Sequence, residues 1–237
     1  MTLIDIEDLH CGYPGREVIT GLNLKLEPGG RVGLAGHTGS GKTTLLKTIM
    51  GLVRPVRGTV RVDGAACTDG EGLRCARRVL GYLFQHPDDQ LFCPTVIEDV
   101  AFGPLNLGRS PREAREIAEQ CLEMVGLAGF GPRLTHRLSG GEKRLASLAG
   151  VLAMRPKALL LDEPTTGLDP ESKARVAEVL TGLDLGLLVV SHEWDFLLQV
   201  ATQHYMLDHG HLHAVEASPH THVHVHALGD VPHSHDE

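Results

Sequence analysis

The spacing of apolar positions divides the chain into stretches of strand and stretches of helix. Residues 2–9 and 18–26 alternate apolar with polar side chains, as half-buried strands do, and residues 31–36 are a short apolar run that ends in glycine. Residues 43–52 follow with helical spacing. Two further strands are expected at 58–64 and 79–85. The N-terminal part is therefore predicted to be mainly β-structure.

The middle of the chain is dominated by two predicted helices. Residues 110–127 form a strong amphipathic pattern, with Ser110 at the N-cap, Pro111 at the first helical position and Glu113 where a capping box needs it. The second helix is expected at 140–154, just before a proline that marks its end.

Beyond these helices, apolar strands and helices alternate. Residues 158–162 and 185–192 are continuous apolar runs, and residues 170–180 between them have helical spacing with Pro170 near the start. Continuous apolar strands separated by helices predict a parallel sheet that is covered on both faces. The chain is therefore predicted to belong to the α/β class.

Composition narrows the functional classes. The 237 residues, 42% of them apolar, suffice for one large domain or a domain with a subdomain. A formal charge of -8 argues against non-specific nucleic-acid binding, so no nucleic-acid partner is expected. No apolar run approaches the length of a membrane span and the start lacks a signal-peptide pattern, so we expect a cytosolic location. The five cysteines have no zinc-ligand spacing and are expected to be reduced thiols.

A glycine-rich segment follows the third predicted strand. Its sequence, GHTGSGKT, fits G-x-x-x-x-G-K-[ST] between a strand and a helix, where backbone N–H groups and the helix N-terminus face phosphate. Lys42 would reach the β- and γ-phosphates of ATP, and the Thr43 hydroxyl would ligate Mg²⁺. An ordinary glycine-rich turn is the alternative interpretation. The ATP-binding residues predicted here are Gly36, His37, Thr38, Gly39, Ser40, Gly41, Lys42, Thr43 and Thr44.

Two carboxylates stand at the end of the apolar strand 158–162. Asp162 suits a Mg²⁺ ligand, usually through water, and Glu163 suits a general base that polarises an attacking water. The alternative is an acidic pair that starts a turn before Pro164. A phosphate loop in the same chain favours the functional interpretation.

The segment LSGGE opens the second predicted helix and offers another anion site. A single nucleotide seldom needs two separate helix-terminus sites from one chain. We therefore expect a dimer in which the phosphate loop of one chain and Ser139, Gly140 and Gly141 of the other clamp the same ATP.

Together these motifs resemble the ATP-binding-cassette (ABC) ATPases over about residues 2–215. The resemblance implies that Tyr13 stacks on adenine, that Gln85 contacts Mg²⁺ and senses a membrane partner, that Asp169 couples the two sites of the dimer, and that His192 contacts the γ-phosphate. Alone, Tyr13 could be a half-buried turn residue and His192 a core histidine. The catalytic residues implied are Glu163, His192 and Gln85, and the Mg²⁺ ligands implied are Thr43, Gln85 and Asp162.

The same resemblance implies the architecture. It predicts a P-loop NTPase (RecA-like) core with an N-terminal antiparallel β subdomain and an inserted α-helical subdomain at about 86–156, within an ATPase domain at 2–217. Residues 84–108 and 138–170 look like energy-coupling-factor ATPases, and most like the ATPase of the cobalt/nickel importers. One departure is His86, where that group often has asparagine, and another is SHEWDF in place of the commoner threonine–histidine–aspartate pattern.

The expected function is that of an ATP-driven motor for a membrane importer, most like those for nickel or cobalt. The chain would work as a homodimer, with ATP and Mg²⁺ as cofactors, peripheral to the cytoplasmic face of the membrane. A groove around Gln85, residues 87–92 and the helical subdomain would hold a helix of a membrane scaffold subunit. Alternatives are a vitamin importer, a soluble ABC ATPase of DNA repair or translation, and a regulatory metal-binding protein. The interval 42–139 has no room for the long coiled coil that a repair ATPase needs.

The C-terminal segment 218–237 is rich in histidine and is expected to be a low-complexity tail. His220, His222, His224 and His226 fall at every second position, which would put them on one side of an extended chain. They are candidate weak Ni²⁺ or Co²⁺ ligands that act as a buffer or sensor beside the importer. A solvated, pH-responsive end with incidental metal affinity is the alternative.

Overall fold

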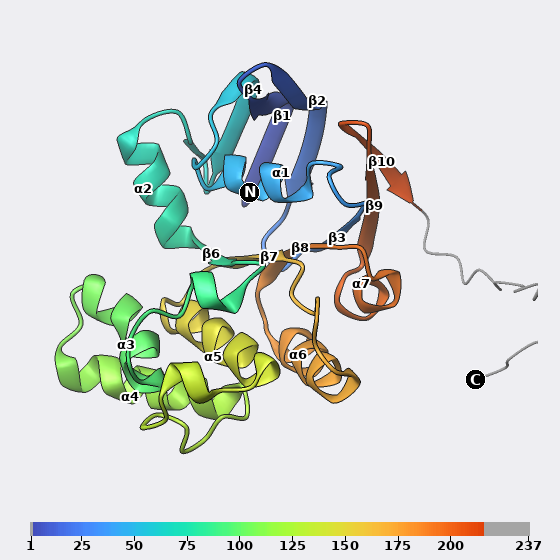
Figure 1. Ribbon diagram of the computed structural model, residues 1–237. Coiled ribbons are helices and arrows are strands. Elements are labelled where there is room, and N and C mark those ends of the chain that lie inside the picture. The colour runs from blue at the N-terminus through green and yellow to red at the C-terminus, as the bar shows by residue number, and fades with distance from the viewer. Residues whose placement is uncertain (1, 216–237) are drawn as a thin grey trace, which may run out of the picture.

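The computed structural model describes residues 2–215, which form two β-sheets and a group of helices (Figure 1). The first sheet is antiparallel, in the order β2-β1-β4-β5, and the second has the order β10-β9-β3-β8-β7-β6. The strands of the first sheet are β1 (Ile4–Tyr13), β2 (Arg16–Leu26), β4 (Pro55–Val62) and β5 (Ala65–Ala66). Those of the second are β3 (Arg31–Ala35), β6 (Leu80–Leu83), β7 (Ala158–Asp162), β8 (Gly186–Ser191), β9 (Gln203–Asp208) and β10 (His211–Val215).

The second sheet is parallel except for β10, the strand at one of its edges. β9, β3, β8, β7 and β6 pair in parallel, whereas β10 pairs antiparallel to β9. The prediction of an α/β fold with a covered parallel sheet and an N-terminal antiparallel sheet is confirmed. In a parallel sheet the carboxyl ends of the strands share one edge, and this edge receives the segments that follow β3, β6, β7 and β8.

Two hydrophobic cores lie on opposite faces of the parallel sheet. Leu160 and Leu188 pair across β7 and β8 and pack with α1 (Lys42–Ile49) and the antiparallel sheet. Leu159 and Leu187, one residue earlier on each strand, point to the other face and join the core of the helices that follow β6 in the chain. Both faces are therefore buried, which explains the continuous apolar runs in these strands.

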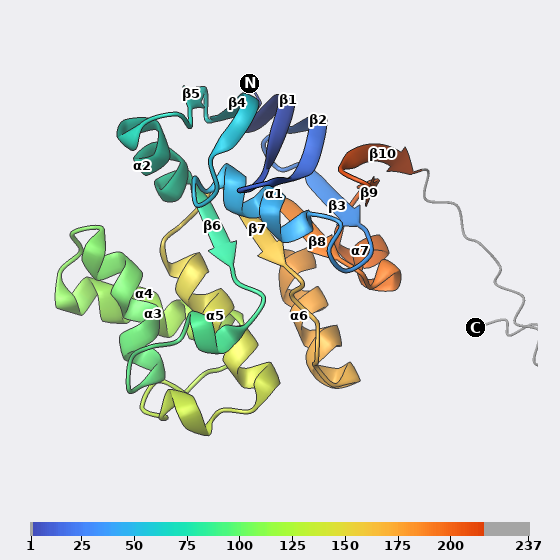
Figure 2. The same ribbon diagram turned by 45° about the horizontal axis from the view of Figure 1, so that its top comes forward.

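Three helices pack together beside β6 and β7 (Figures 1 and 2). They are α3 (Val96–Asn106), α4 (Pro111–Met124) and α5 (Gly140–Ala153), with the 3₁₀ turns η1 (Pro87–Asp89) and η2 (Thr135–Arg137) between β6 and α5. Each of the three helices begins with a capping box, and the predicted box of Ser110 and Glu113 is present. Within residues 2–215, no helix combines the length and apolarity that crossing a membrane requires.

The apolar spacing did not single out three helices. These are α2 (Gly70–Val79), α3 and α7 (Trp194–Val200), whereas the predicted helix around 170–180 is α6 (Pro170–Gly182). α2 starts with Gly70, Glu71 and Gly72, and α7 spans only seven residues, so neither has a long apolar stripe. α3 contains Pro104, which is normally a helix breaker.

Candidate active site

The glycine-rich loop connects β3 to α1 at the carboxyl edge of the parallel sheet. Gly41 is the N-cap of α1 with φ 110°, in the range that favours glycine, and a Cβ there would lie 2.7 Å from Cγ1 of Val18. A Cβ at Gly36 would lie 2.6 Å from the Ser40 hydroxyl. Ser40 is itself buried, and its Oγ has no hydrogen-bond partner among the described residues. The tight packing of this loop and its buried hydroxyl group fit the phosphate-binding loop that the sequence predicts.

Lys42, the first residue of α1, is buried and turns its ammonium group back to the start of the loop. Its Nζ donates to the carbonyl of Gly36 at 2.7 Å and to that of His37 at 3.2 Å. The same Nζ lies 3.3 Å from Oε1 of Glu163. A cation held between the loop and the predicted base is placed to contact a bound triphosphate.

Glu163 is held in a strained conformation directly after β7. Its φ is 47°, uncommon for a residue with a Cβ, and its N–H donates to the carbonyl of Val190 at 2.9 Å. Its Oε2 accepts hydrogen bonds from the backbone N–H of His192 at 3.2 Å and from His192 Nδ1 at 2.7 Å. Burial on its own would raise the pKa of this carboxyl, but the His192 hydrogen bond and the Lys42 charge outweigh it and hold the pKa below the ordinary value. The carboxylate is therefore ionised at neutral pH, as a general base must be.

Asp162 is buried at the end of β7 and receives two hydroxyl groups. Thr43 Oγ1 donates to its Oδ1 at 2.9 Å, and the Tyr82 hydroxyl donates to its Oδ2 at 3.0 Å. Burial raises the pKa of this carboxyl, and the two hydroxyl donors partly oppose the rise. Thr43 and Asp162, two of the three predicted Mg²⁺ ligands, are therefore direct neighbours, and both offer oxygen atoms of the hard type that Mg²⁺ prefers.

A cleft of about 370 Å³ joins the loop to Glu163. Tyr13, 49% exposed at the end of β1, stands at this cleft with Gln85, Glu163 and His192. The structure thus brings together the predicted adenine-stacking residue, the loop and the predicted catalytic residues. The residues that line the cleft are Tyr13, Arg16, Val18, Thr38, Gly39, Gly41, Lys42, Thr43, Thr44, Gln85, Glu163, Thr166 and His192.

Ser139, Gly140, Gly141 and Asp169 lie outside this cleft. Ser139 is the N-cap of α5, and together with Gly141 it lines a different cavity beside α6. Asp169 is the N-cap of α6 and accepts from the Ser172 hydroxyl at 2.7 Å. A Cβ on Gly141 would lie 2.1 Å from that hydroxyl, so the two helix N-termini are close neighbours. One chain alone therefore does not place the LSGGE segment at its own phosphate loop.

Several side chains at the site were not predicted from the sequence. Thr166 lines the cleft and donates to Glu163 at 3.2 Å, and Arg16 adds a cation beside Tyr13. Tyr82 reaches Asp162 from the neighbouring strand β6, and because all of β6 is buried, no apolar–polar alternation in the sequence indicates this contact. Within residues 2–215, no group of three or more His, Cys, Asp and Glu side chains is arranged to hold a metal ion. The predicted tail ligands His220, His222, His224 and His226 lie outside the described residues.

A sequence profile described as ABC transporter matches residues 19–166, which include the loop, the LSGGE segment and both carboxylates. The chain belongs to the ABC transporter ATPase family. A relative from Nitratidesulfovibrio vulgaris, provisionally named an ABC transporter ATP-binding protein, is 52% identical over 235 residues, covering 98% of this chain and 86% of the relative. The energy-coupling factor transporter ATP-binding protein EcfA of Methanothermobacter thermautotrophicus is 42% identical over 222 residues, 92% of this chain and 71% of that protein.

Solved structures of ABC ATPases have the same fold. CbiO1 of Clostridium perfringens, described as part of the ABC transporter complex CbiONQ, superposes with a TM-score of 0.81 at 30% identity, over 89% of this chain and 86% of CbiO1. The dimeric ABC transporter cassette MJ0796 superposes with a TM-score of 0.78 at 27% identity, over 88% of this chain and 96% of the cassette. The predicted membership of the ABC ATPases, of the energy-coupling-factor type, is confirmed by these relatives.

Proposed function

We propose that this chain is the ATP-hydrolysing motor subunit of an energy-coupling-factor importer, and that Glu163, His192 and Gln85 do the chemistry. The observation that carries the proposal is the contact of Glu163 with both Lys42 and His192 in the cleft of the phosphate loop. The relation to EcfA proteins supports the importer class.

Each residue then has a definite task at the ATP site. The loop amides and Lys42 bind the phosphates, and Tyr13 stacks on the base. Glu163 takes a proton from the attacking water, and His192 orients Glu163 through its Nδ1 and contacts the γ-phosphate. Thr43, Asp162 and Gln85 would hold Mg²⁺, which neutralises charge on the phosphate oxygens when bound.

The catalytic unit is a homodimer in this proposal. Ser139, Gly140, Gly141 and Asp169 of one chain complete the ATP site of the other, since within one chain none of them lines the ATP cleft, and Ser139 and Gly141 line a separate cavity. The dimers formed by the related cassette MJ0796, including one bound to ADP and phosphate, support this arrangement.

The membrane partner docks, in the same proposal, at a second cavity of about 460 Å³ beside β6 and α3. Its lining includes Leu91 and Phe92 of the segment predicted to form the groove, together with Phe84 and apolar residues of α5. Phe92 is 65% exposed and stacks edge-on against Phe102 with ring centroids 4.8 Å apart. An exposed aromatic pair in an apolar groove suits a scaffold helix. This docking would hold the motor at the cytoplasmic face as a peripheral subunit.

Nickel or cobalt is the cargo we propose, with a vitamin as the second candidate. The proposal rests on the sequence resemblance of residues 84–108 and 138–170 to the metal importers' ATPases and on the histidine-rich segment 218–237. The test is uptake of nickel, cobalt and vitamins by cells expressing the complete transporter, combined with a steady-state ATPase assay. Uptake of a vitamin but neither metal would reject the metal cargo. An assembled complex that hydrolyses no ATP would reject the motor role and favour a regulatory protein.

The tail is assigned a metal-sensing role in this proposal. Removal of residues 218–237 should change the response of the transporter to added Ni²⁺ or Co²⁺ and leave the basal ATPase rate intact. An unchanged response to both metals would leave the tail as a solvated end.

A further inference from the structure

A buried arginine connects α5 to the segment that carries Gln85. The Arg144 side chain is only 1% exposed. Its guanidinium donates one hydrogen bond to the carbonyl of Phe84 at 2.5 Å and another to the carbonyl of Gln85. A planar fork with two fixed donors suits two successive carbonyl groups. Arg144 therefore holds the Phe84–Gln85 backbone against α5.

The folding stability of the protein does not explain why the charged side chain of Arg144 is buried here. No carboxylate within residues 2–215 lies at ion-pair distance from Arg144, and its Nε has no hydrogen-bond partner there. Burial lowers the pKa of the guanidinium to about 10. Because a buried cation is expensive, a methionine or leucine of similar volume would serve the packing better. We therefore infer that Arg144 has a role other than packing.

Two more side chains connect the same segment to the same helix. Gln90 accepts from the Phe84 N–H at 3.1 Å and donates to the carbonyl of Ser147 at 3.3 Å, so both backbone groups of Phe84 are held. Lys143 Nζ lies 2.6 Å from Asp88 Oδ1. β6 ends at Leu83, just before these links begin, so residues 84–90 are attached to α5 by side chains and leave the sheet.

The helix at the other end of these links lines the apolar groove, whereas Gln85 lines the ATP cleft. In α5, Ser147, Gly150 and Val151 line the apolar groove that Phe84 and Gln90 also line. The guanidinium of Arg144 therefore connects α5 directly to the backbone of Gln85.

We propose that Arg144 is a positioning residue, which sets the place of Gln85 in the ATP cleft according to the position of α5 and so couples the groove to hydrolysis. The coupling to hydrolysis rests on the function proposed above; the attachment of Gln85 to α5 does not. Gln85 would hold Mg²⁺ and Glu163 would act on the attacking water, as proposed above, and Arg144 acts only through Gln85.

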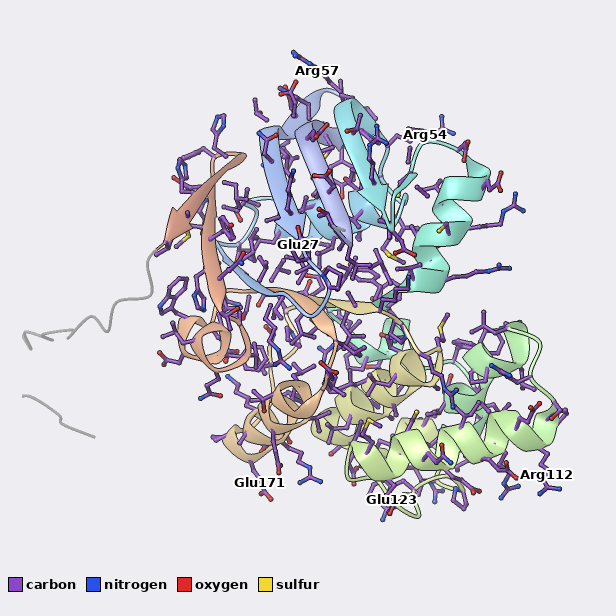
Figure 3. The ribbon with its side chains drawn as sticks, turned by 180° about the vertical axis from the view of Figure 1, so that it is seen from behind. Glu27, Arg54, Arg57, Arg112, Glu123 and Glu171 are labelled. Carbon is purple, nitrogen blue, oxygen red and sulfur yellow. The ribbon has the colours of Figure 1, made fainter. Side chains whose placement is uncertain are left out.

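The variants are Arg144→Met, which removes both donors, and Arg144→Lys, which keeps the charge but lacks the planar fork. Arg112→Met is the matched control, because Arg112 is 89% exposed on α4 and points away from the helical group (Figure 3). Hydrogen exchange of the full-length chain, followed by mass spectrometry, reports on the attachment without any need for ATPase activity. We expect amides of residues 84–91 to exchange at least about tenfold faster in Arg144→Met, with residues 145–153 of α5 unchanged.

Kinetics test the coupling. In Arg144→Met we expect kcat to fall about 10- to 100-fold, because a misplaced Gln85 disturbs the reacting geometry. The Kd for a fluorescent ATP analogue without Mg²⁺ should stay within about twofold, because the loop is untouched. The Mg²⁺ concentration for half-maximal activity should rise, with Arg144→Lys between Arg144→Met and wild type.

Each outcome decides the proposal. Unchanged exchange at 84–91 in a folded Arg144→Met chain overturns the attachment. Faster exchange with unchanged kcat and Mg²⁺ dependence overturns the coupling. Faster exchange throughout α5, with weaker nucleotide binding, shows a merely structural role and also overturns it. A wild-type chain that hydrolyses no ATP refutes the proposed function, and the exchange experiment still decides the attachment.

Discussion

Replacing Glu163 by glutamine separates the chemistry of the site from its stability. A glutamine oxygen in the place of Oε2 keeps the hydrogen bonds from His192, which lie at 3.2 Å and 2.7 Å. In the place of Oε1, however, an amide NH₂ would face the Lys42 ammonium, now 3.3 Å away. The substitution therefore removes the base and the counter-charge of Lys42 and keeps the contact with His192.

The substitution is expected to lower both the folding free energy and kcat. Breaking a buried ion pair costs about 3–5 kcal/mol when the remaining charge has no other partner. Lys42 retains the carbonyls of Gly36 and His37, at 2.7 Å and 3.2 Å, so we expect a loss of folding free energy of at most about 3 kcal/mol. Loss of a general base costs about 10²- to 10⁴-fold in kcat, provided that proton transfer is part of the slow step. Turnover should therefore disappear in a chain that still folds and binds ATP.

The assay is phosphate release at saturating ATP and Mg²⁺, with light scattering to follow ATP-dependent dimerisation. Glu163→Gln should dimerise in ATP and remain dimeric, because the nucleotide is not consumed. Glu123→Gln, the same change at an exposed position of α4 (Figure 3), should behave as wild type. A kcat for Glu163→Gln within about tenfold of wild type, in a folded chain, would refute the assignment of Glu163 as the base.

Four further predictions follow from the same geometry. Lys173→Glu should lower kcat by displacing the segment that carries His192, because Lys173 on α6 lies 2.6 Å from Glu193. The double variant Lys173→Glu/Glu193→Lys should recover much of the rate, and a double variant as slow as Lys173→Glu would contradict this prediction. Gly41→Ala should weaken ATP binding at least about tenfold because of its φ of 110° and the Val18 contact, whereas Gly182→Ala, where a Cβ meets nothing within 4 Å, should bind ATP as wild type in a titration. Tyr82→Phe should cost about 1–3 kcal/mol in denaturant unfolding and raise the Mg²⁺ requirement, since Asp162 loses one of its two hydroxyl donors; an unchanged midpoint would contradict it. Because the pKa of Glu163 is lowered from its ordinary value of 4.5, the stability due to its ionisation should persist above that pH and be lost as the pH falls through the lower folded-state pKa; Glu163→Gln should lack this part of the acid transition.

The local elements could be predicted because their signals are local. Two-residue alternation marks β1 and β2, continuous apolar runs mark β7 and β8, and a capping box marks the start of α4. The three helices that were missed have weak local signals, because α2 begins with two glycines among its first three residues, α3 contains Pro104 and α7 is short. Apolar periodicity identifies a helix only when it has enough turns to show a stripe.

The sequence by itself determined the chemical inventory, because the phosphate loop, the LSGGE segment and the Asp162–Glu163 pair are each contiguous. Only the tertiary structure decided which of these groups touch. Thr43 meets Asp162 across 119 positions, and His192 meets Glu163 across 29, because β3, β7 and β8 align in parallel at one edge. The links from Arg144 to Phe84 and from Tyr82 to Asp162 depend in the same way on packing. Residue spacing records short-range conformational preference, whereas contacts between distant residues depend on strand order, register and the burial of both sheet faces.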